Sequence, residues 1–239
     1  MQRQGVKKIV SCAVTGALAL GTLWCLFAGL ADRADVFAEG PFAGEAVILD
    51  AGHGGEDGGA VSPSGVEESG LNLAIVLRLD QMLGLYGVNT VLLRTEDVSL
   101  HDSDAETLRE KKVSDLHNRV ERIESIEGGT LISIHQNTYP AEKYHGAQVF
   151  YADEASSLPL AQRAQELLKE VLDPTNQRVA ARISDSVYLM NHITCPAILV
   201  ECGFLSNPEE ERLLQDGGYQ LKIAGALTGA YLQMRQEST

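Results

Sequence analysis

The chain has 239 residues and a formal net charge of −14, a length that suits one catalytic domain with a short extra segment. The first 31 residues hold three basic and no acidic side chains, so the remaining 16 basic and 33 acidic residues give a net charge of −17. Such an acidic surface argues against nucleic acid as a partner and against electrostatic docking on anionic lipid.

An uncharged apolar segment occupies residues 9–31 and follows three basic residues. It exceeds the apolar core of a cleaved signal peptide, about 7 to 15 residues, and reaches the roughly 20 that cross a bilayer as a helix. We interpret residues 1–31 as a membrane anchor, with a cleaved signal as the alternative because residues 36–38 (Val-Phe-Ala) resemble a cleavage site. Both interpretations predict an extracytoplasmic domain, anchored or secreted, that contacts the membrane through this segment only.

Residues 32–44 form a predicted polar linker, and residues 45–236 form the predicted catalytic domain. In this domain short β-branched runs alternate with helical periodicity. The predicted strands cover residues 46–50, 88–93, 131–135, 147–151, 187–190 and 197–200. The predicted helices cover residues 71–86, 108–126, 159–172, 208–214 and 219–234. This alternation predicts an α/β fold with a mostly parallel, twisted sheet of about six strands and helices on both faces.

Two cysteines, Cys195 and Cys202, belong to the predicted domain and flank its last strand. An extended segment of this length separates them by roughly 23 Å, and a disulfide spans about 7 Å at most between Cα atoms. We therefore expect two free thiols.

Polar residues stand where predicted strands end. His53 follows the first strand, His135 ends the third and Glu201 ends the last. Ligands of open α/β sheets bind beyond the carboxyl ends of the strands, so we expect these side chains to converge. A carboxylate at the start of the first helix, Glu67 or Glu68, lies on the same edge. Two imidazoles, one carboxylate and an open position suit a catalytic Zn²⁺, and Glu201 suits the general base.

The glycine-rich loop at residues 52–59 has a second interpretation as a phosphate cradle. Glu56 and Asp57 would repel phosphate there, and the loop lacks a lysine and a full dinucleotide motif. We therefore interpret the glycines as allowing the tight bend that turns His53 toward the metal.

Each candidate also has an ordinary structural explanation. A single histidine at a strand end is usually a hydrogen-bonded packing residue, an acid at a helix start favours the macrodipole, and Glu201 could pair with a buried arginine. Their gathering on one edge favours the functional interpretation. We assign the remaining histidines to the surface or to supporting roles: His101, His117, His145 and His192.

Four motifs resemble the zinc-dependent N-acetylmuramoyl-L-alanine amidases across residues 47–232. They read ILDAGHGG at 48–55, ESGLNLA at 68–74, SIHQN at 133–137 and LVECGFLSN at 199–207. The resemblance implies metal ligands and a catalytic glutamate at four positions: His53, Glu68 and His135 for the metal, and Glu201 for catalysis. It selects Glu68 over Glu67 because the family ligand stands three residues before the leucine that is Leu71 here.

The chain departs from the family pattern at Ser69 and Gln136, positions to which we assign no metal contact. Arg94 and Asp97 match a further family feature, for which the sequence supports only a structural role. The implied reaction is hydrolysis of the amide bond between N-acetylmuramic acid and the L-alanine of the stem peptide in peptidoglycan. Residues 109–116 resemble the sporulation branch, which implies a role in forming the muramic lactam of spore cortex for germination.

Two alternatives remain at this stage. One is another zinc peptidase of the cell wall, and the other is an amidase-like domain that is non-catalytic or depends on a partner. The low positive charge and the absence of recognisable wall-binding repeats lead us to expect an activating or targeting protein partner beside the peptidoglycan substrate.

Overall fold

The computed structural model describes residues 45–237, so the predicted anchor and the whole predicted linker lie outside the described residues. Within the described part, no helix combines the length and apolar character needed to cross a membrane. Six strands form a sheet in the order β2-β1-β3-β6-β4-β5. They are β1 (Ala46–Ala51), β2 (Thr90–Leu92), β3 (Gly129–Asn137), β4 (Gln148–Tyr151), β5 (Ala181–Arg182) and β6 (Ala197–Phe204).

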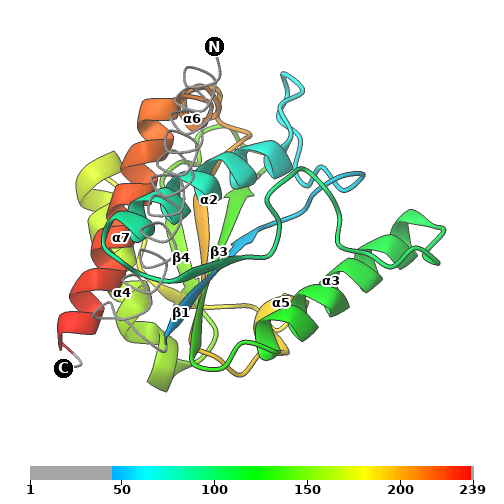
Figure 1. Cartoon of the computed structure of the whole chain (residues 1–239). Helices are drawn as coiled ribbons and strands as arrows, with labels where there is room; N and C mark the ends of the chain where they lie inside the picture. The colour runs from blue at the N-terminus through cyan, green and yellow to red at the C-terminus, as the bar shows by residue number, and fades with distance from the viewer. Residues whose placement is uncertain (1–44, 238–239) are drawn as a thin grey trace, which may run out of the picture. The chain divides into compact units, whose positions relative to one another are not determined.

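The sheet is mostly parallel, as the alternation of elements predicts. Strands β2, β1, β3 and β6 run in one direction, and β4 pairs with β6 in the antiparallel sense. Helices cover both faces, with α2, α4 and α7 on one side and α3 and α5 on the other (Figure 1). Their bounds are α2 (Glu68–Leu85), α3 (Leu108–Glu124), α4 (Glu154–Leu172), α5 (Tyr188–Asn191), α6 (Pro208–Leu214) and α7 (Gly217–Glu237).

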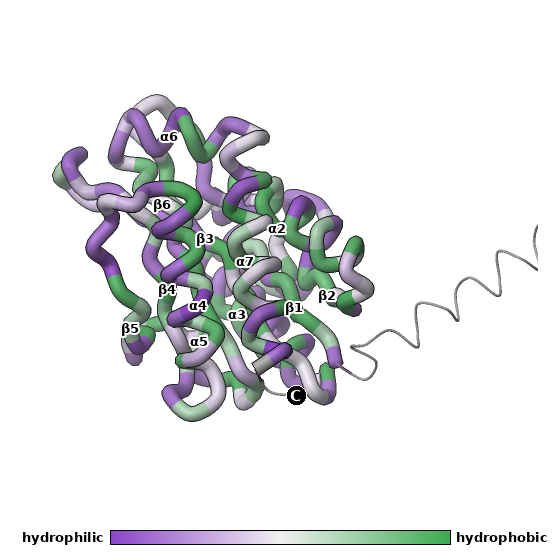
Figure 2. The backbone as a smooth tube through the Cα atoms, turned by 90° about the vertical axis from the view of Figure 1, so that its left-hand side faces the viewer, coloured by the Kyte–Doolittle hydropathy of each residue, from purple (hydrophilic) through white to green (hydrophobic). Residues whose placement is uncertain are grey.

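The central strands are hydrophobic because both of their faces are covered. Val47, Ile48 and Leu49 are all fully buried, so consecutive residues of β1 pack against opposite helical layers. Figure 2 shows hydrophobic residues along β1 and β3, with many hydrophilic residues in the segments around them. This burial fixes the register of the strands, and the register places the polar residues at their carboxyl ends.

The predicted strand at residues 187–190 is wrong, because this segment is helix α5. Leu189 and Met190 are buried in the core beneath α3, and Asn191 donates hydrogen bonds to the carbonyl oxygens of Ser184 and Val187. A short apolar run does not distinguish a strand from one buried helical turn. The sixth strand is instead the two-residue β5, which pairs with β4.

Other elements differ from the prediction at their ends. Helix α4 begins at Glu154 and not near Pro159, because Asp153 caps it by accepting hydrogen bonds from the amides of Ala155 and Ser156. Strands β3 and β6 continue beyond His135 and Glu201, with an irregularity of pairing after His135. These two residues therefore lie inside their strands, near the carboxyl ends, and not at the last positions.

Cys195 and Cys202 are free thiols in the structure. Cys202 lies in β6 and is fully buried, whereas Cys195 lies before that strand and is partly exposed. Burial raises the pKa of the Cys195 thiol to about 11.

Candidate metal centre

His53 lies in the loop between β1 and α2 with its backbone in the left-handed region, at φ 62°. A residue other than glycine adopts this conformation only when its surroundings hold it there. Arg119 supplies that support, because its Nη2 donates a 2.7 Å hydrogen bond to the carbonyl oxygen of His53. Asp57 lies 2.9 Å from Nδ1 of the imidazole, which leaves Nε2 directed toward Glu68 at 3.4 Å.

The loop glycines make room for the imidazoles and the carboxylate. A Cβ atom at Gly52 would lie 2.1 Å from Cε1 of His135, and one at Gly59 would lie 2.7 Å from Oε2 of Glu68. The amides of Gly54 and Gly59 already donate to oxygens of Asp57. The glycines thus serve close packing around the site, and these amides are not free to cradle a phosphate.

Glu68 is the first residue of α2 and is 3% exposed. Its Oε1 accepts hydrogen bonds from the amide of Gln136 (3.0 Å) and from Nδ2 of Asn72 (3.2 Å). Its Oε2 accepts from the amide of Ala60 at 2.8 Å. Burial raises the pKa of Glu68, but the hydrogen bond and charge of His135 outweigh it and lower the pKa to about 2. The carboxylate is therefore ionised and fixed in place.

His135 and Glu201 are direct partners in the pairing of β3 with β6. Neighbouring strands lie about 4.8 Å apart, so the two side chains project side by side from the same face of the sheet. Nδ1 of His135 lies 2.9 Å from Oε1 of Glu68. His53, His135 and Glu201 line one cleft of about 250 Å³. Register alone therefore brings the strand residues together.

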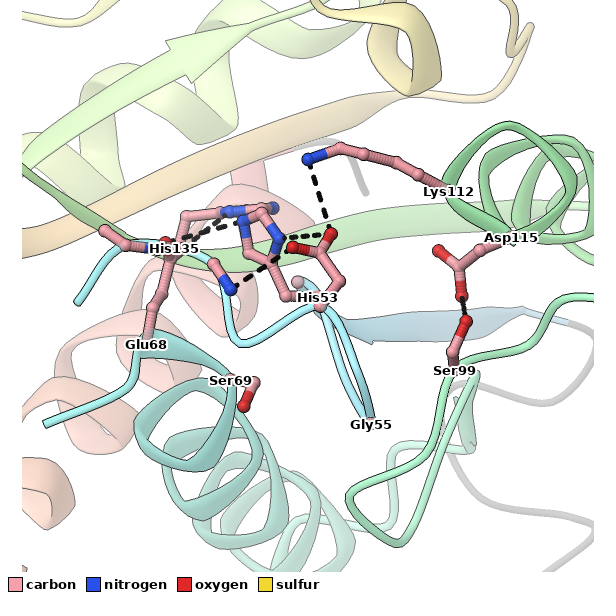
Figure 3. Close-up of polar contacts among 12 residues, drawn as sticks. His53, Gly55, Glu68, Ser69, Ser99, Lys112, Asp115 and His135 are labelled. Carbon is pink, nitrogen blue, oxygen red and sulfur yellow. Dashed lines mark hydrogen bonds and ion pairs between the residues drawn. The ribbon is translucent and has the colours of Figure 1, made fainter. Parts of the chain in front are cut away.

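The three predicted ligands meet at one point. One donor atom from each of His53, Glu68 and His135 lies within 4.8 Å of the other two, and Figure 3 shows the two imidazoles beside the carboxylate. Ligands bound about 2.0 to 2.1 Å from a tetrahedral zinc ion lie roughly 3.3 Å from one another. Oε1 of Glu68 lies 2.9 Å from Nδ1 of His135, and Oε2 lies 3.4 Å from Nε2 of His53. Each imidazole thus stands at about this separation from a carboxylate oxygen, and the donor set fits a zinc ion.

Glu201 differs from Glu68 in its surroundings. Its Oε2 is buried and has no hydrogen-bond partner among the described residues. Burial raises the pKa of Glu201 to about 7. A buried oxygen without a partner costs free energy, and in native proteins it calls for a functional explanation. The buried arginines of the described part, Arg94 and Arg119, donate to other groups, so neither gives Glu201 a purely structural role.

Arg119, on α3, is 2% exposed. Its Nε donates to Asp115 at 2.7 Å, and its Nη1 donates to Asp50 and to the carbonyl oxygen of Ala51. Asp50 also accepts a hydrogen bond from Ser133 of β3 at 2.6 Å. The network joins α3, β1 and β3 beneath the site. The sequence analysis missed it, because only the tertiary structure brings Arg119 and Asp50 together.

Arg94 and Asp97 take the structural role that the sequence suggested. Arg94 is buried and donates to the carbonyl oxygens of Ala51, Gly52 and Ser69. Asp97 accepts from the amide of Gly55 at 3.1 Å. Both residues hold the backbone that carries His53.

The sequence analysis also missed Asp57, which it considered only as a charge that repels phosphate. Asp57 follows His53 by four residues in a glycine-rich loop. This spacing could have suggested that its carboxylate folds back to contact the imidazole. The hydrogen bond from His53 holds the pKa of Asp57 well below its usual range. A carboxylate on the far nitrogen orients a metal-binding imidazole and sets its tautomer.

The other histidines lie outside this cluster. His145 pairs with Asp173, His101 contacts Ser99, and His117 and His192 lie against the ring of Tyr188. Glu67 is the residue before α2, and its backbone pairs with Val61. The structure thus places Glu68, and not Glu67, among the histidines.

The family model for N-acetylmuramoyl-L-alanine amidase matches residues 47–232. The chain belongs to this family. The match covers most of the chain and nearly all of the described domain, including the four candidate residues. The chain is therefore assigned the family's N-acetylmuramoyl-L-alanine amidase activity, and the match favours this activity over that of another wall peptidase.

Relatives and solved structures agree with this assignment. The amidase is 37% identical over 188 residues, 78% of each chain, to the germination-specific N-acetylmuramoyl-L-alanine amidase of Bacillus subtilis. It is 28% identical over 231 residues to the amidase AmiA of Salmonella typhimurium, with 78% of this chain and 74% of that one covered. Its fold matches the CwlD amidase of Clostridioides difficile, solved in complex with the GerS lipoprotein, with a TM-score of 0.77, 39% identity, and coverage of 80% of this chain and 98% of that one.

Proposed function

We propose that this amidase is zinc-dependent, with His53, Glu68 and His135 as the metal ligands and Glu201 as the catalytic base. Its substrate is peptidoglycan, and the bond it hydrolyses joins N-acetylmuramic acid to the L-alanine of the stem peptide. The observation that supports this most is the meeting of three donor atoms within 4.8 Å, beside a glutamate whose buried oxygen has no partner.

When bound, zinc supplies Lewis acidity, which polarises the scissile carbonyl group and acidifies a water molecule. Glu201 accepts a proton of the attacking water at its unpartnered carboxylate oxygen as the water oxygen bonds to the scissile carbonyl carbon. It then gives the proton to the alanine nitrogen as the C–N bond breaks, which releases the amine and leaves a carboxylate on the lactyl group. Glu68 cannot serve as the base, because both of its oxygens accept hydrogen bonds from neighbouring amides. Asp57 holds the imidazole of His53 in the orientation that presents Nε2.

The experiment that tests this proposal is product analysis. Purified full-length protein with one equivalent of Zn²⁺ is incubated with peptidoglycan, and the fragments are identified by mass spectrometry. We expect peptide-free muramic acid and a new amino terminus on L-alanine, and we expect a chelator to abolish both. Activity that survives complete removal of metal would contradict the zinc-dependent mechanism.

Metal content tests the ligand assignment separately. His135→Ala should lose stoichiometric zinc, because the strand-borne imidazole cannot be replaced by water without opening the site. His145→Ala is the matched control, since His145 pairs with Asp173 outside the cluster, and it should keep one zinc per chain. Equal zinc content in both variants would remove His135 from the ligand set.

We further propose that the enzyme acts outside the cytoplasm on spore cortex, where peptide removal precedes formation of the muramic lactam. The support is similarity to the germination-specific amidase and to the CwlD amidase. A sporulating host that lacks this protein should form cortex without muramic lactam. The lactam content of purified spores measures this, and a normal content would contradict the cortex role.

A lipoprotein partner is part of the same proposal, because the CwlD structure holds a lipoprotein. Such a partner would locate or activate an acidic enzyme that lacks recognisable wall-binding repeats. Full activity and full zinc occupancy of the purified chain alone would argue against an activating partner.

A further inference from the structure

Carboxylates dominate the cleft beside the metal centre, where Asp50, Asp57, Asp115 and Glu201 all contribute to the lining. Two cationic side chains, Lys112 and Arg119, also line it. Arg119 is 2% exposed, and its guanidinium is fully engaged by Asp50, Asp115 and backbone oxygens. Lys112 is different, because 55% of its side chain is exposed. Of the two cationic side chains that line this cleft in the described part of the chain, Lys112 is therefore the one exposed to solvent.

The position of Lys112 relative to the metal centre follows from two contacts. Its Nζ lies 3.3 Å from Oδ2 of Asp57, and the same oxygen lies 2.9 Å from Nδ1 of His53. Figure 3 shows Lys112 reaching from α3 toward this carboxylate, on the side of His53 away from Glu68. The ammonium group therefore stands one side chain away from an imidazole of the metal centre.

An ammonium group has three hydrogen-bond donors, and Lys112 makes one ion pair, with Asp57. Its remaining donors and its exposure allow it to bind a second anion at the mouth of the cleft. The carboxylates of the cleft repel an anionic substrate, and the single positive charge of Arg119 offsets only one of the two charges of Asp50 and Asp115. Lys112 then supplies the attraction that an anionic substrate group requires.

The substrate named in the proposed function, on which this inference rests, carries such a group close to the scissile bond. The residue after L-alanine in a stem peptide is D-glutamate, which presents either a free carboxylate or a carboxamide. Two residues of extended peptide span at most about 7 Å. Nζ of Lys112 and Nδ1 of His53 contact the same oxygen of Asp57, so the ammonium group lies within a comparable distance of the His53 imidazole.

We propose that Lys112 binds the free carboxylate of the second stem-peptide residue and so makes the enzyme prefer the acidic stem peptide over its amidated form. The contact is a charge-assisted hydrogen bond at a half-exposed site, retained while Lys112 keeps its pair with Asp57. Lys112 is in this role a specificity-determining residue and takes no part in the proton transfers.

A purely structural role for Lys112 makes a different prediction. If Lys112 only holds Asp57 against His53, its removal should weaken zinc binding and slow the cleavage of both forms of the substrate equally. A substrate pair that differs only in carboxylate or carboxamide at the second residue separates the two roles.

The test uses zinc-loaded full-length protein, Lys112→Met, and Lys111→Met as the matched control. Lys111 is the preceding residue of α3 and pairs with Glu56 at 2.6 Å. It does not line this cleft, although it lines the neighbouring hollow beside His53 and Asp57. The substrates are disaccharide muropeptides with either D-glutamate or its amide. We expect Lys112→Met to raise the KM for the acidic form about tenfold, in the range of a charged hydrogen bond at a half-exposed site. In the same variant, the KM for the amidated form and the zinc content should change little. In Lys111→Met, the KM values for both substrates should change little. Lys112→Arg should retain most of the preference.

Equal changes with both substrates, or no change, would overturn the role of Lys112 and leave the amidase function intact. The second measurement is the affinity of the same two muropeptides, determined by calorimetry. It compares the Glu201→Gln variant with the double variant that also carries Lys112→Met. If no form of the enzyme cleaves either substrate, the proposed function fails, and the binding preference alone decides the role of Lys112. If Glu201→Gln binds the acidic and the amidated muropeptide with equal affinity, the proposed role of Lys112 is contradicted.

Discussion

His53 and His135 present imidazoles to the same carboxylate from different kinds of backbone. His135 lies in a buried strand, and its position follows from the pairing of β3 with β6. His53 lies in a loop, at a left-handed φ of 62°, and depends on Arg119, Arg94 and Asp57 for its place. The strand side of the site is therefore set by the sheet, and the loop side by a polar network that crosses three elements.

The largest expected effect lies on the strand side. Glu201→Gln removes the proposed base and leaves the sheet unchanged, so kcat should fall by about 10² to 10⁴, the range of general acid–base catalysis. Zinc content and thermal stability should stay close to those of the wild type. A variant that keeps its full kcat would remove Glu201 from the mechanism.

The second effect lies in the network that supports the loop side. Arg119→Met leaves Asp50 and Asp115 buried without a cation, which should destabilise the fold by about 3 to 5 kcal/mol. Urea unfolding measures this free energy. Arg109→Met on the same helix is the control, because Arg109 is exposed, and its effect should stay within about 0.5 kcal/mol. Similar stabilities of the two variants would show that the network contributes little.

A third change tests the contact between loop and strand directly. Gly52→Ala places a Cβ atom 2.1 Å from Cε1 of His135, so the imidazole has to move out of the site. Zinc affinity should fall by more than the roughly 10- to 100-fold that changes in the outer shell cause. Gly70→Ala is the matched control, since a Cβ atom there meets nothing within 4 Å. Chelator competition compares the two, and equal affinities would contradict the steric explanation.

The smallest effect concerns the orientation of His53. Asp57→Asn keeps the shape of the side chain but removes its charge, so zinc affinity should fall by about 10- to 100-fold. Glu56→Gln makes the same change of charge one residue earlier, where the side chain is exposed and pairs with Lys111. It should leave zinc affinity near that of the wild type. Equal losses in both variants would indicate a general effect of loop charge and no specific role for Asp57.

The fold was largely predictable because its signals are local. Buried strands of a parallel sheet read as continuous apolar runs, as in β1, and the helices between them show clear periodicity. Residues 187–190 show the limit, because four apolar or aromatic residues fit a buried strand and a buried helical turn equally well. Their helical conformation depends on packing against α3 and on contacts with Ser184.

The sequence by itself determined the α/β order and three of the candidate residues, His53, His135 and Glu201, because chain order in such a sheet sends strand ends to one edge. The choice of Glu68 over Glu67 came from the family resemblance, and the structure supplies its physical reason, since Glu68 is buried among amides while Glu67 precedes the helix. Only the tertiary structure decided how His53 is held and where Lys112 stands. Both depend on α3 lying over the loop after β1, a contact between segments more than 50 residues apart that no local pattern records.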